Sequence, residues 1–402
     1  MNEAVITQPE STAAPNPPAA RVVALIGLTL ALCYLVVLCS AYLGGHLLID
    51  AQGEPLANDF VNVWAAGRFA LDGQPAAAYD WPLHKAAEIR AVGHDFANYY
   101  GWHYPPTFLF VAAALAVLPY LLAAIVWLVA TLVAYATMLA KILGGRKGFL
   151  VALGFPAALW NVTAGQNGFF TAALIGGTLC LLERRPALAG VCLGLLTYKP
   201  QFGLLFPIVL IADRRWLTIV VAAAVAVGLA VLSWLAFGAA SWVAFVQSML
   251  ATSRVVLGEG GADWNRLQSL FGFMRAHGAS ETIAWSVQAA AAVAAGAGLI
   301  ALWRSRATFE LKAAALACGA LLATPYIYMY DLVVLAVAGA FLLRDGLQRG
   351  FSFVDGTALA AAAALILIYP YATMQVGLAA TLIVSALIAF RACCIAAQTA
   401  SH

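Results

Sequence analysis

The first residues that could do chemistry stand in an acidic, glycine-punctuated segment, QGEPLANDFVNVWAAGRFALDGQPAAAYD, at residues 52–80. Asp59 precedes residues 60–71, whose apolar side chains recur near helical spacing, so this stretch predicts an amphipathic helix lying on a membrane surface. A carboxylate at the start of that helix can act as a general base if it lies within hydrogen-bond reach of the proton it removes. Asp is equally a favoured N-cap residue. Arg68 is a further candidate contact for a substrate, with a solvated role as its alternative.

Polar side chains also stand in turns between apolar runs. Gln166 and Asn167 lie in AGQNG, where they either hydrogen-bond the frayed helix ends or recognise sugar hydroxyls. His103 and Tyr104 precede Pro105, and they open another helix at the same face as the first acidic segment.

Lys199, in YKPQ, is a lysine within an apolar run, and Gln201 adds a second polar group beside it. An ionisable group inside a membrane is expensive and by default indicates function. The ammonium suits a phosphate, although its side chain can instead extend to the membrane surface. Asp331, after PYIYMY, has three interpretations: a partner for Lys199, a helix cap, or a sugar contact.

The segment DWNRLQS supplies Trp264 and Arg266. A Trp ring can stack on a sugar and an Arg can bind a phosphate. A single Trp at a membrane interface is also a common anchor.

The elements that must position these residues are membrane helices. Hydrophobic residues make up 64% of the 402 residues and charged residues only 10%, which is typical of a polytopic helical membrane protein. In a bilayer such runs must be helices, because every backbone polar group needs an internal partner. Motifs for nucleotide binding, zinc proteases and Ser hydrolases are absent. We therefore expect no cofactor and no nucleic-acid partner, and membrane lipids as surroundings.

The distribution of charge predicts the orientation. The short gaps between apolar runs hold thirteen Lys and Arg residues, whereas residues 47–103 hold three against seven Asp and Glu. Positive charge favours the cytoplasmic side, so two long loops, about 47–103 and 238–282, face outward. We predict a disordered cytoplasmic tail at 1–21 and a single integral-membrane domain at 22–402. The protein is expected in the inner (plasma) membrane, with a cytoplasmic N-terminus and its site at the outer or periplasmic face.

We predict an all-α fold of about 11–13 helices, with juxtamembrane helices in the first long loop. The helices flanking Gln166, Lys199 and Asp331 are only about 11–16 residues long and rise roughly 16–24 Å, less than the hydrocarbon core of about 30 Å. Their turns should therefore lie in a cavity that opens outward. Residues 103–140 contain Leu-Pro at 118–119 and look like two helices. The first half is either a shallow re-entrant element or leans over the outer loop.

The ordered motifs NDF, YPP, GQN, AGVCLGLLTYKPQ, WN…QS and TPYIYMYDL together resemble the family 87 glycosyltransferases. The resemblance runs from about Asp59 to Leu332 and rests on the order of the motifs. It implies the GT-C fold. It also implies an inverting enzyme that moves a hexose, mannose-like, from a polyprenyl-phosphate donor to a lipid or glycan acceptor.

The resemblance also implies roles for residues. Asp59 would be the catalytic base, Lys199 and Arg266 would contact the donor phosphate, and Gln166 and Gln201 would line the sugar site. An Asp-x-Asp near Asp59 is absent, so no metal is expected. Where such enzymes often carry a His late in the chain, this sequence has tyrosines, among them Tyr328 as a candidate contact.

Two rival functions share these features. A lipid-linked sugar flippase or transporter predicts internal repeats and polar residues reaching the membrane centre from both faces, whereas here the polar groups gather at one face. A transferase of whole oligosaccharides would have the same outer loop and basic site.

Overall fold

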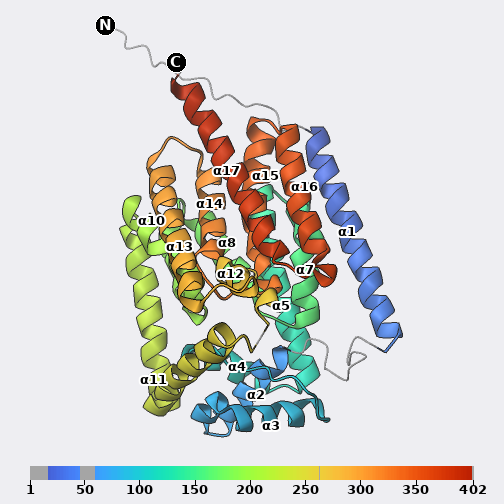
Figure 1. Ribbon diagram of the computed structural model, residues 1–402, viewed down its shortest axis with the longest axis vertical. Coiled ribbons are helices and arrows are strands. Elements are labelled where there is room, and N and C mark those ends of the chain that lie inside the picture. The colour runs from blue at the N-terminus through green and yellow to red at the C-terminus, as the bar shows by residue number, and fades with distance from the viewer. Residues whose placement is uncertain (1–16, 46–58, 262, 401–402) are drawn as a thin grey trace.

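The protein is all-helical in the computed structural model, which describes residues 17–45, 59–261 and 263–400 and shows 81% helix with no strand in them. Figure 1 shows the helices running mostly parallel, with a layer of shorter helices crossing one end. The predicted tail lies outside the described residues as far as residue 16. Its last residues belong to the first helix, α1 (Pro17–Leu43).

Among the described residues, five helices are long and apolar enough to cross a membrane. They are α1, α5 (Tyr120–Leu143), α11 (Trp216–Thr252), α13 (Glu281–Arg304) and α17 (Val376–Ala400). Large apolar side chains cover their outer faces, such as Leu25 and Val36, which are 62% and 63% exposed. Such surfaces are stable against lipid and not against water, so the prediction of a polytopic membrane protein is confirmed.

Shorter helices pack between the long ones. They are α6 (Arg146–Gly154), α7 (Pro156–Ala164), α8 (Gly168–Leu181), α9 (Pro186–Leu195), α10 (Phe206–Ala212), α14 (Phe309–Leu322), α15 (Val333–Arg349) and α16 (Phe353–Leu367). The 14 residues of α8 and of α14 rise about 21 Å, so these helices stop short of a full crossing. The 3-10 segments η3 (Leu196–Tyr198), η4 (Pro200–Gly203) and η7 (Met329–Leu332) connect several of them. Lys199 lies between η3 and η4, Gln201 lies in η4 and Asp331 in η7.

Residues 103–140 form two helices, as the Leu-Pro predicted, and the first of them, α4 (Leu109–Ala116), packs against α2 (Phe60–Leu71) of the first long loop. A short 3-10 turn, η2 (Pro106–Phe108), leads into α4, and α5 begins directly after Pro119. Pro ends α4 because it cannot continue a helix ladder. Helix α4 packs on α2 so closely that a Cβ on Gly67 would lie 2.1 Å from the carbonyl oxygen of Ala112.

The first long loop contains the predicted helices, but α2 is not a surface helix. Most of its residues are buried, because η1 (Pro75–Tyr79), α3 (Trp81–Val92) and α4 pack around it. The expectation of an amphipathic helix lying on the membrane is therefore wrong: protein, rather than lipid, covers both faces of α2. Residues 46–58 of this loop lie outside the described residues.

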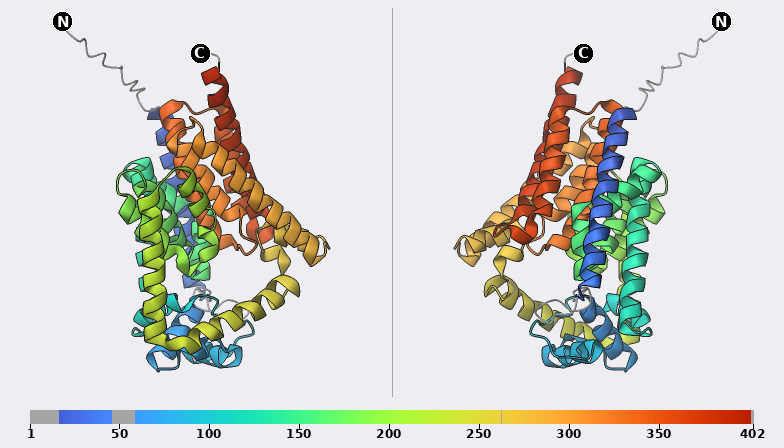
Figure 2. Two further views of the ribbon diagram at one scale, coloured as in Figure 1. Left: turned by 90° about the vertical axis from the view of Figure 1, so that its left-hand side faces the viewer. Right: turned by 90° about the vertical axis from the view of Figure 1, so that its right-hand side faces the viewer.

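The second long loop begins where α11 bends. Gly238 has φ 76° and ψ 162° inside the helix, a conformation open almost only to glycine. The second half of α11 therefore turns sideways and runs along the layer of α2 and α3 (Figure 2). Phe245 on this half packs on Tyr79, with ring centroids 6.0 Å apart. The chain returns through η5 (Ser253–Gly258), η6 (Trp264–Arg266) and α12 (Leu270–Ala276).

Candidate active site

Asp59 lies where the first-loop layer meets the membrane helices. Its backbone N–H donates to the carbonyl oxygen of Ala164, 3.1 Å away at the end of α7. Although Asp59 is the residue before α2, its side chain makes no capping hydrogen bond. Its Oδ2 instead accepts a hydrogen bond from Nε2 of Gln166 at 3.0 Å. The capping interpretation of Asp59 is therefore wrong, and the carboxylate faces the polar turn between α7 and α8.

The amide of Gln166 is held in one orientation. Its Oε1 accepts hydrogen bonds from the backbone N–H of Asn167, at 3.1 Å, and from the hydroxyl of Tyr104, at 3.3 Å. Nδ2 of Asn167 donates to the same Tyr104 hydroxyl at 2.7 Å. Because Oε1 is engaged by two donors, Nε2 is the atom left to face Asp59. The positive φ of Gly165, 68°, ends α7 and starts this turn.

Lys199 and Asp331 form a buried ion pair. Nζ of Lys199 lies 2.8 Å from Oδ1 of Asp331, and the two side chains are 9% and 2% exposed. The other Asp331 oxygen accepts the backbone N–H of Tyr328 at 3.1 Å. The predicted pairing of Asp331 with Lys199 is thus confirmed. Asp331 does not cap the helix that follows it; it lies within η7, where it accepts the N–H of Tyr328 at the start of that turn. The side chain of Lys199 stays inside and does not extend to the membrane surface.

Aromatic rings join the amide group to the ion pair. Tyr198, next to Lys199, stacks on Tyr104 with ring centroids 6.1 Å apart, and its hydroxyl contacts Oγ1 of Thr171 at 2.5 Å and the carbonyl oxygen of Asn167 at 3.3 Å. The backbone makes a second link between the two groups. Gly168 lies so close to Tyr330 that a Cβ on it would be 2.2 Å from the carbonyl oxygen of Tyr330. The turn after α7 and the η7 segment are therefore in direct contact.

The charges of this cluster act on Asp59. Burial raises the pKa of the Asp59 carboxyl from 3.8 to about 6. The hydrogen bond from Gln166 and the positive charges of Lys199 and Arg266 work against this rise, while the charge of Asp331 adds to it. Burial also raises the pKa of Tyr104, so its hydroxyl stays neutral near Asp59. A carboxyl with a pKa close to neutral is suited to act as a general base.

Three tyrosines stand where a His was expected. Tyr326 and Tyr328 meet edge to face at 5.1 Å, and Tyr328 stacks on Tyr330 at 5.6 Å. Nζ of Lys199 lies 5.3 Å from the ring centre of Tyr330, within cation–π range. The late segment thus brings aromatic faces and hydroxyls to the cluster in place of an imidazole.

The second loop holds this tyrosine segment in place. The backbone N–H of Gln268 donates to the carbonyl oxygen of Ile327 at 2.8 Å, and Oγ of Ser269 donates to that of Pro325 at 2.6 Å. Both side chains are buried. Sequence reasoning named the neighbours Trp264 and Arg266 and missed this clamp, because its partners are backbone atoms more than 50 residues away.

The remaining predicted contacts lie at the edge of the cluster or outside it. Arg266 is exposed and acts on Asp59 through its charge. Trp264 donates to the carbonyl oxygen of Leu257 at 3.0 Å, and Arg275 covers its ring at 4.1 Å. These contacts fix Trp264 within the second loop, and sugar stacking by it stays a prediction.

Arg68, His103 and Gln201 are less closely tied to Asp59. Arg68 is 42% exposed and pairs with Asp72 at 3.1 Å. Nδ1 of His103 lies 3.2 Å from Oγ1 of Thr252, and burial lowers the pKa of His103 to about 4, so it is neutral at pH 7. Gln201 lies half-buried in η4 beside Lys199. Substrate contacts by these residues stay predictions.

No group of three His, Cys, Asp or Glu side chains suited to a metal ion occurs in the part of the chain that the structure describes. The independence from metal implied by the resemblance stays a prediction.

Fold and site together define a class of protein: a polytopic helical membrane protein in which turns between short helices hold a partly buried carboxylate and a buried ion pair. Residues 102–325, more than half of the chain, match glycosyltransferase family 87, and the protein belongs to this family of membrane glycosyltransferases. Comparison with curated proteins and with solved structures found no match. The matched range includes Gln166 and Lys199 but leaves out Asp59 and Asp331. The place of these two carboxylates beside the matched residues comes from the structure alone.

Proposed function

We propose that the protein is an inverting, GT-C-like hexosyltransferase that uses a polyprenyl-phosphate sugar, mannose-like, with Asp59 as its general base. The acceptor is a hydroxyl of a lipid or glycan at the outer face of the plasma membrane. The observation that carries this proposal is the Gln166–Asp59 hydrogen bond, because it turns a carboxylate with a pKa of about 6 toward the polar turns. The orientation rests on the excess of Lys and Arg in the short gaps on the opposite side.

In the proposed reaction the acceptor oxygen attacks the anomeric carbon as Asp59 removes its proton. The bond between the anomeric carbon and the phosphate oxygen breaks, and its electrons leave with the polyprenyl phosphate. A single displacement inverts the anomeric configuration. Asp59 afterwards releases the proton to water.

The charge that gathers on the leaving phosphate needs a cation nearby. The charge of Lys199 is matched by Asp331. Within the described part of the chain Arg266 has no acidic side chain within 4.0 Å, and it is exposed. Arg266 is therefore the better placed cation for an incoming phosphate. Lys199 can bind a phosphate only if its ammonium contacts the phosphate and Asp331 together. The rings of Tyr326, Tyr328 and Tyr330 offer stacking faces for the sugar.

The donor class is tested with purified protein in proteoliposomes that contain a membrane lipid extract as acceptor. One sample receives polyprenyl-phosphate [14C]mannose and a second receives GDP-[14C]mannose. We expect radioactive product only from the lipid donor, with release of polyprenyl phosphate. Product from the nucleotide sugar would contradict the proposed donor. Movement of intact labelled donor across the bilayer without any product would instead support the flippase.

A further inference from the structure

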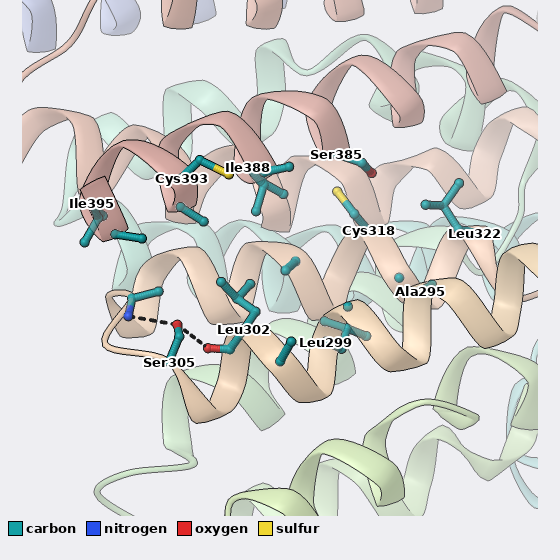
Figure 3. Close-up of a pocket in the computed structure, with 18 of the residues that line it drawn as sticks. Ala295, Leu299, Leu302, Ser305, Cys318, Leu322, Ser385, Ile388, Cys393 and Ile395 are labelled. Carbon is teal, nitrogen blue, oxygen red and sulfur yellow. Dashed lines mark hydrogen bonds between the residues drawn. The ribbon is translucent and has the colours of Figure 1, made fainter. Parts of the chain in front are cut away.

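A second site lies far from Asp59, in a groove between α13, α14 and α17. Its volume is about 580 Å³, within the range of about 300–1,000 Å³ typical of ligand sites. The walls are apolar and built largely from small residues, such as Ala295, Gly298, Gly319 and Ala392. Figure 3 shows α13 and α17 as its two sides, with Leu322 at one end and Ser305 at the other. The small side chains leave room for a flexible hydrocarbon chain.

The length of the groove matches one leaflet of a bilayer. On α17 its lining runs from Ser385 to Ala396, which is a rise of about 17 Å. The hydrocarbon core of a bilayer is about 30 Å thick. If the end at Arg306 lies at the membrane surface, where α13 ends, the other end reaches about the middle of the bilayer.

The surface end of the groove is positively charged. Arg306 lines it, and two more cations flank this turn: Arg304 ends α13, and Lys312 stands near the start of α14. Nζ of Lys312 donates to the carbonyl oxygen of Ser305 at 3.0 Å, which holds this cation at the turn. The acids beside this turn each face a cation of another helix. Glu310, in the first turn of α14, lies 3.3 Å from Arg344 of α15. Asp345, which accepts a hydrogen bond from Thr308, lies 2.9 Å from Arg391 of α17. An anion at the surface end therefore meets unbalanced positive charge.

We propose that this groove binds an anionic phospholipid, with one acyl chain between α13 and α17 and the phosphate at Arg306. The polarity of the groove favours this occupant over the tail of a polyprenyl carrier. A carrier whose phosphate sits at the site of Asp59 would bring only its hydrocarbon end here and would have no use for the cations. The inference rests on the membrane fold and does not require the proposed transferase reaction.

The test uses nanodiscs of phosphatidylcholine that hold the full chain and a trace of phosphatidylglycerol with a photoactivatable group in mid-chain. Cross-linked peptides are mapped by mass spectrometry and compared with those from a phosphatidylcholine probe of the same chain. We expect phosphatidylglycerol to label residues 295–302 and 385–395 in preference to phosphatidylcholine. Arg306→Gln should reduce this labelling about fivefold, the effect of one basic residue at an anionic membrane surface. Arg184→Gln, on another exposed turn, is the matched control.

Filling the groove tests the place of the acyl chain. A Cβ on Gly298 meets nothing within 4 Å, so Gly298→Leu should fold and block the groove, and Ala392→Leu should do the same from α17. Gly228→Leu, at an equally open glycine of α11, is the control and should label as the wild type does. Undiminished labelling of both groove variants, or equal labelling by the two phospholipid probes, would overturn the proposal. Displacement of the probe by polyprenyl phosphate, and not by phosphatidylglycerol, would assign the groove to the carrier.

Discussion

The Asp59 carboxylate experiences two opposing effects. Burial favours its protonated form, whereas the amide of Gln166 and nearby cations favour the ionised form. The outcome, a pKa of about 6, predicts the dependence of the reaction on pH. Below pH 6 the base is increasingly protonated and cannot accept the proton of the acceptor.

We expect the transfer rate to rise with pH through an apparent pKa near 6 and to level off above pH 7. At pH 5 only about a tenth of Asp59 is ionised, so the rate should be about a tenth of its plateau. Initial rates in proteoliposomes between pH 4.5 and 8.5 check this. A rate that stays constant down to pH 4.5 would argue against a base with a raised pKa.

Gln166 is predicted to position the base and to lower its pKa. Gln166→Leu removes the hydrogen bond to Oδ2, so the pKa of Asp59 should rise and the acid limb of the pH profile should move to higher pH. Tyr104→Phe removes a hydrogen bond to the Gln166 amide, which can then rotate away from Asp59. This variant should shift the acid limb in the same direction, but by less. Gln201→Leu removes an amide in η4, beside Lys199, and should leave the acid limb in place. An unshifted limb in Gln166→Leu would show that Gln166 has only a structural role.

The Lys199–Asp331 pair makes a different prediction, for stability. Removing one partner leaves a buried charge uncompensated, and we expect Lys199→Met to destabilise the fold by about 3–5 kcal/mol. The double variant Lys199→Met with Asp331→Asn should recover most of this loss. Thermal unfolding in detergent, analysed as a double-mutant cycle, measures the coupling. Additive losses in the cycle would mean that the pair contributes no coupling energy.

Residue types and short helix lengths were enough to name Asp59, Gln166, Lys199 and Asp331 from the sequence. Their pairing was not predictable to the same degree. Gln166 lies 107 residues from Asp59 and Asp331 lies 132 from Lys199, and only tertiary packing brings them together. For the same reason the sequence could not show that Asp59 turns away from the helix it precedes.

At the scale of elements, the bend in α11 brings the second loop to the site. The first half of α11 crosses the membrane, and the second half lies against η1 and reaches His103 through Thr252. The composition of the sequence predicted that the second long loop begins at residue 238. It could not show that the helix continues beyond it, since a single glycine within an apolar run looks like any other helical glycine.

Two glycine substitutions in α11 should have opposite effects. Gly238→Ala forces an alanine into φ 76° and ψ 162°, and we expect a loss of about 1–3 kcal/mol. Gly228→Ala, in regular helix with open space around it, should stabilise by up to about 1 kcal/mol. Unfolding midpoints of the two variants check this. A neutral Gly238→Ala would show that the bend does not depend on glycine.

The burial of α2 was not predictable from its own sequence. Its apolar residues at helical spacing fit a helix at a membrane surface and a helix covered by protein equally well. Gly67 decides the outcome in the structure, because its missing side chain lets α4 approach.

At the scale of the whole molecule, charge separates the two ends. Most Lys and Arg stand in short turns, such as those between α10 and α11, α13 and α14, and α15 and α16. In Figure 1 these turns lie at the end of the molecule opposite the layer of α2 and α3. The same asymmetry underlies the proposed orientation, with the N-terminus and the basic turns in the cytoplasm.

The orientation is tested with single cysteines in a chain whose seven native cysteines are replaced by serine or alanine. Asp95→Cys, beyond α3, should react with a membrane-impermeant maleimide in intact cells. Arg184→Cys, between α8 and α9, should react only after lysis. The reverse pattern would place the site at the cytoplasmic face.

The central claim is that Asp59 is the base of a membrane glycosyltransferase, and one comparison tests it most directly. Transfer from polyprenyl-phosphate [14C]mannose is measured for the wild type, Asp59→Asn and Asp72→Asn, the last at the other end of α2, all in the same proteoliposomes. The account predicts that Asp59→Asn loses about 10²–10⁴-fold in rate, while Asp72→Asn stays within about twofold of the wild type, as expected of an exposed surface pair. A correctly folded Asp59→Asn that transfers mannose at the wild-type rate would contradict it.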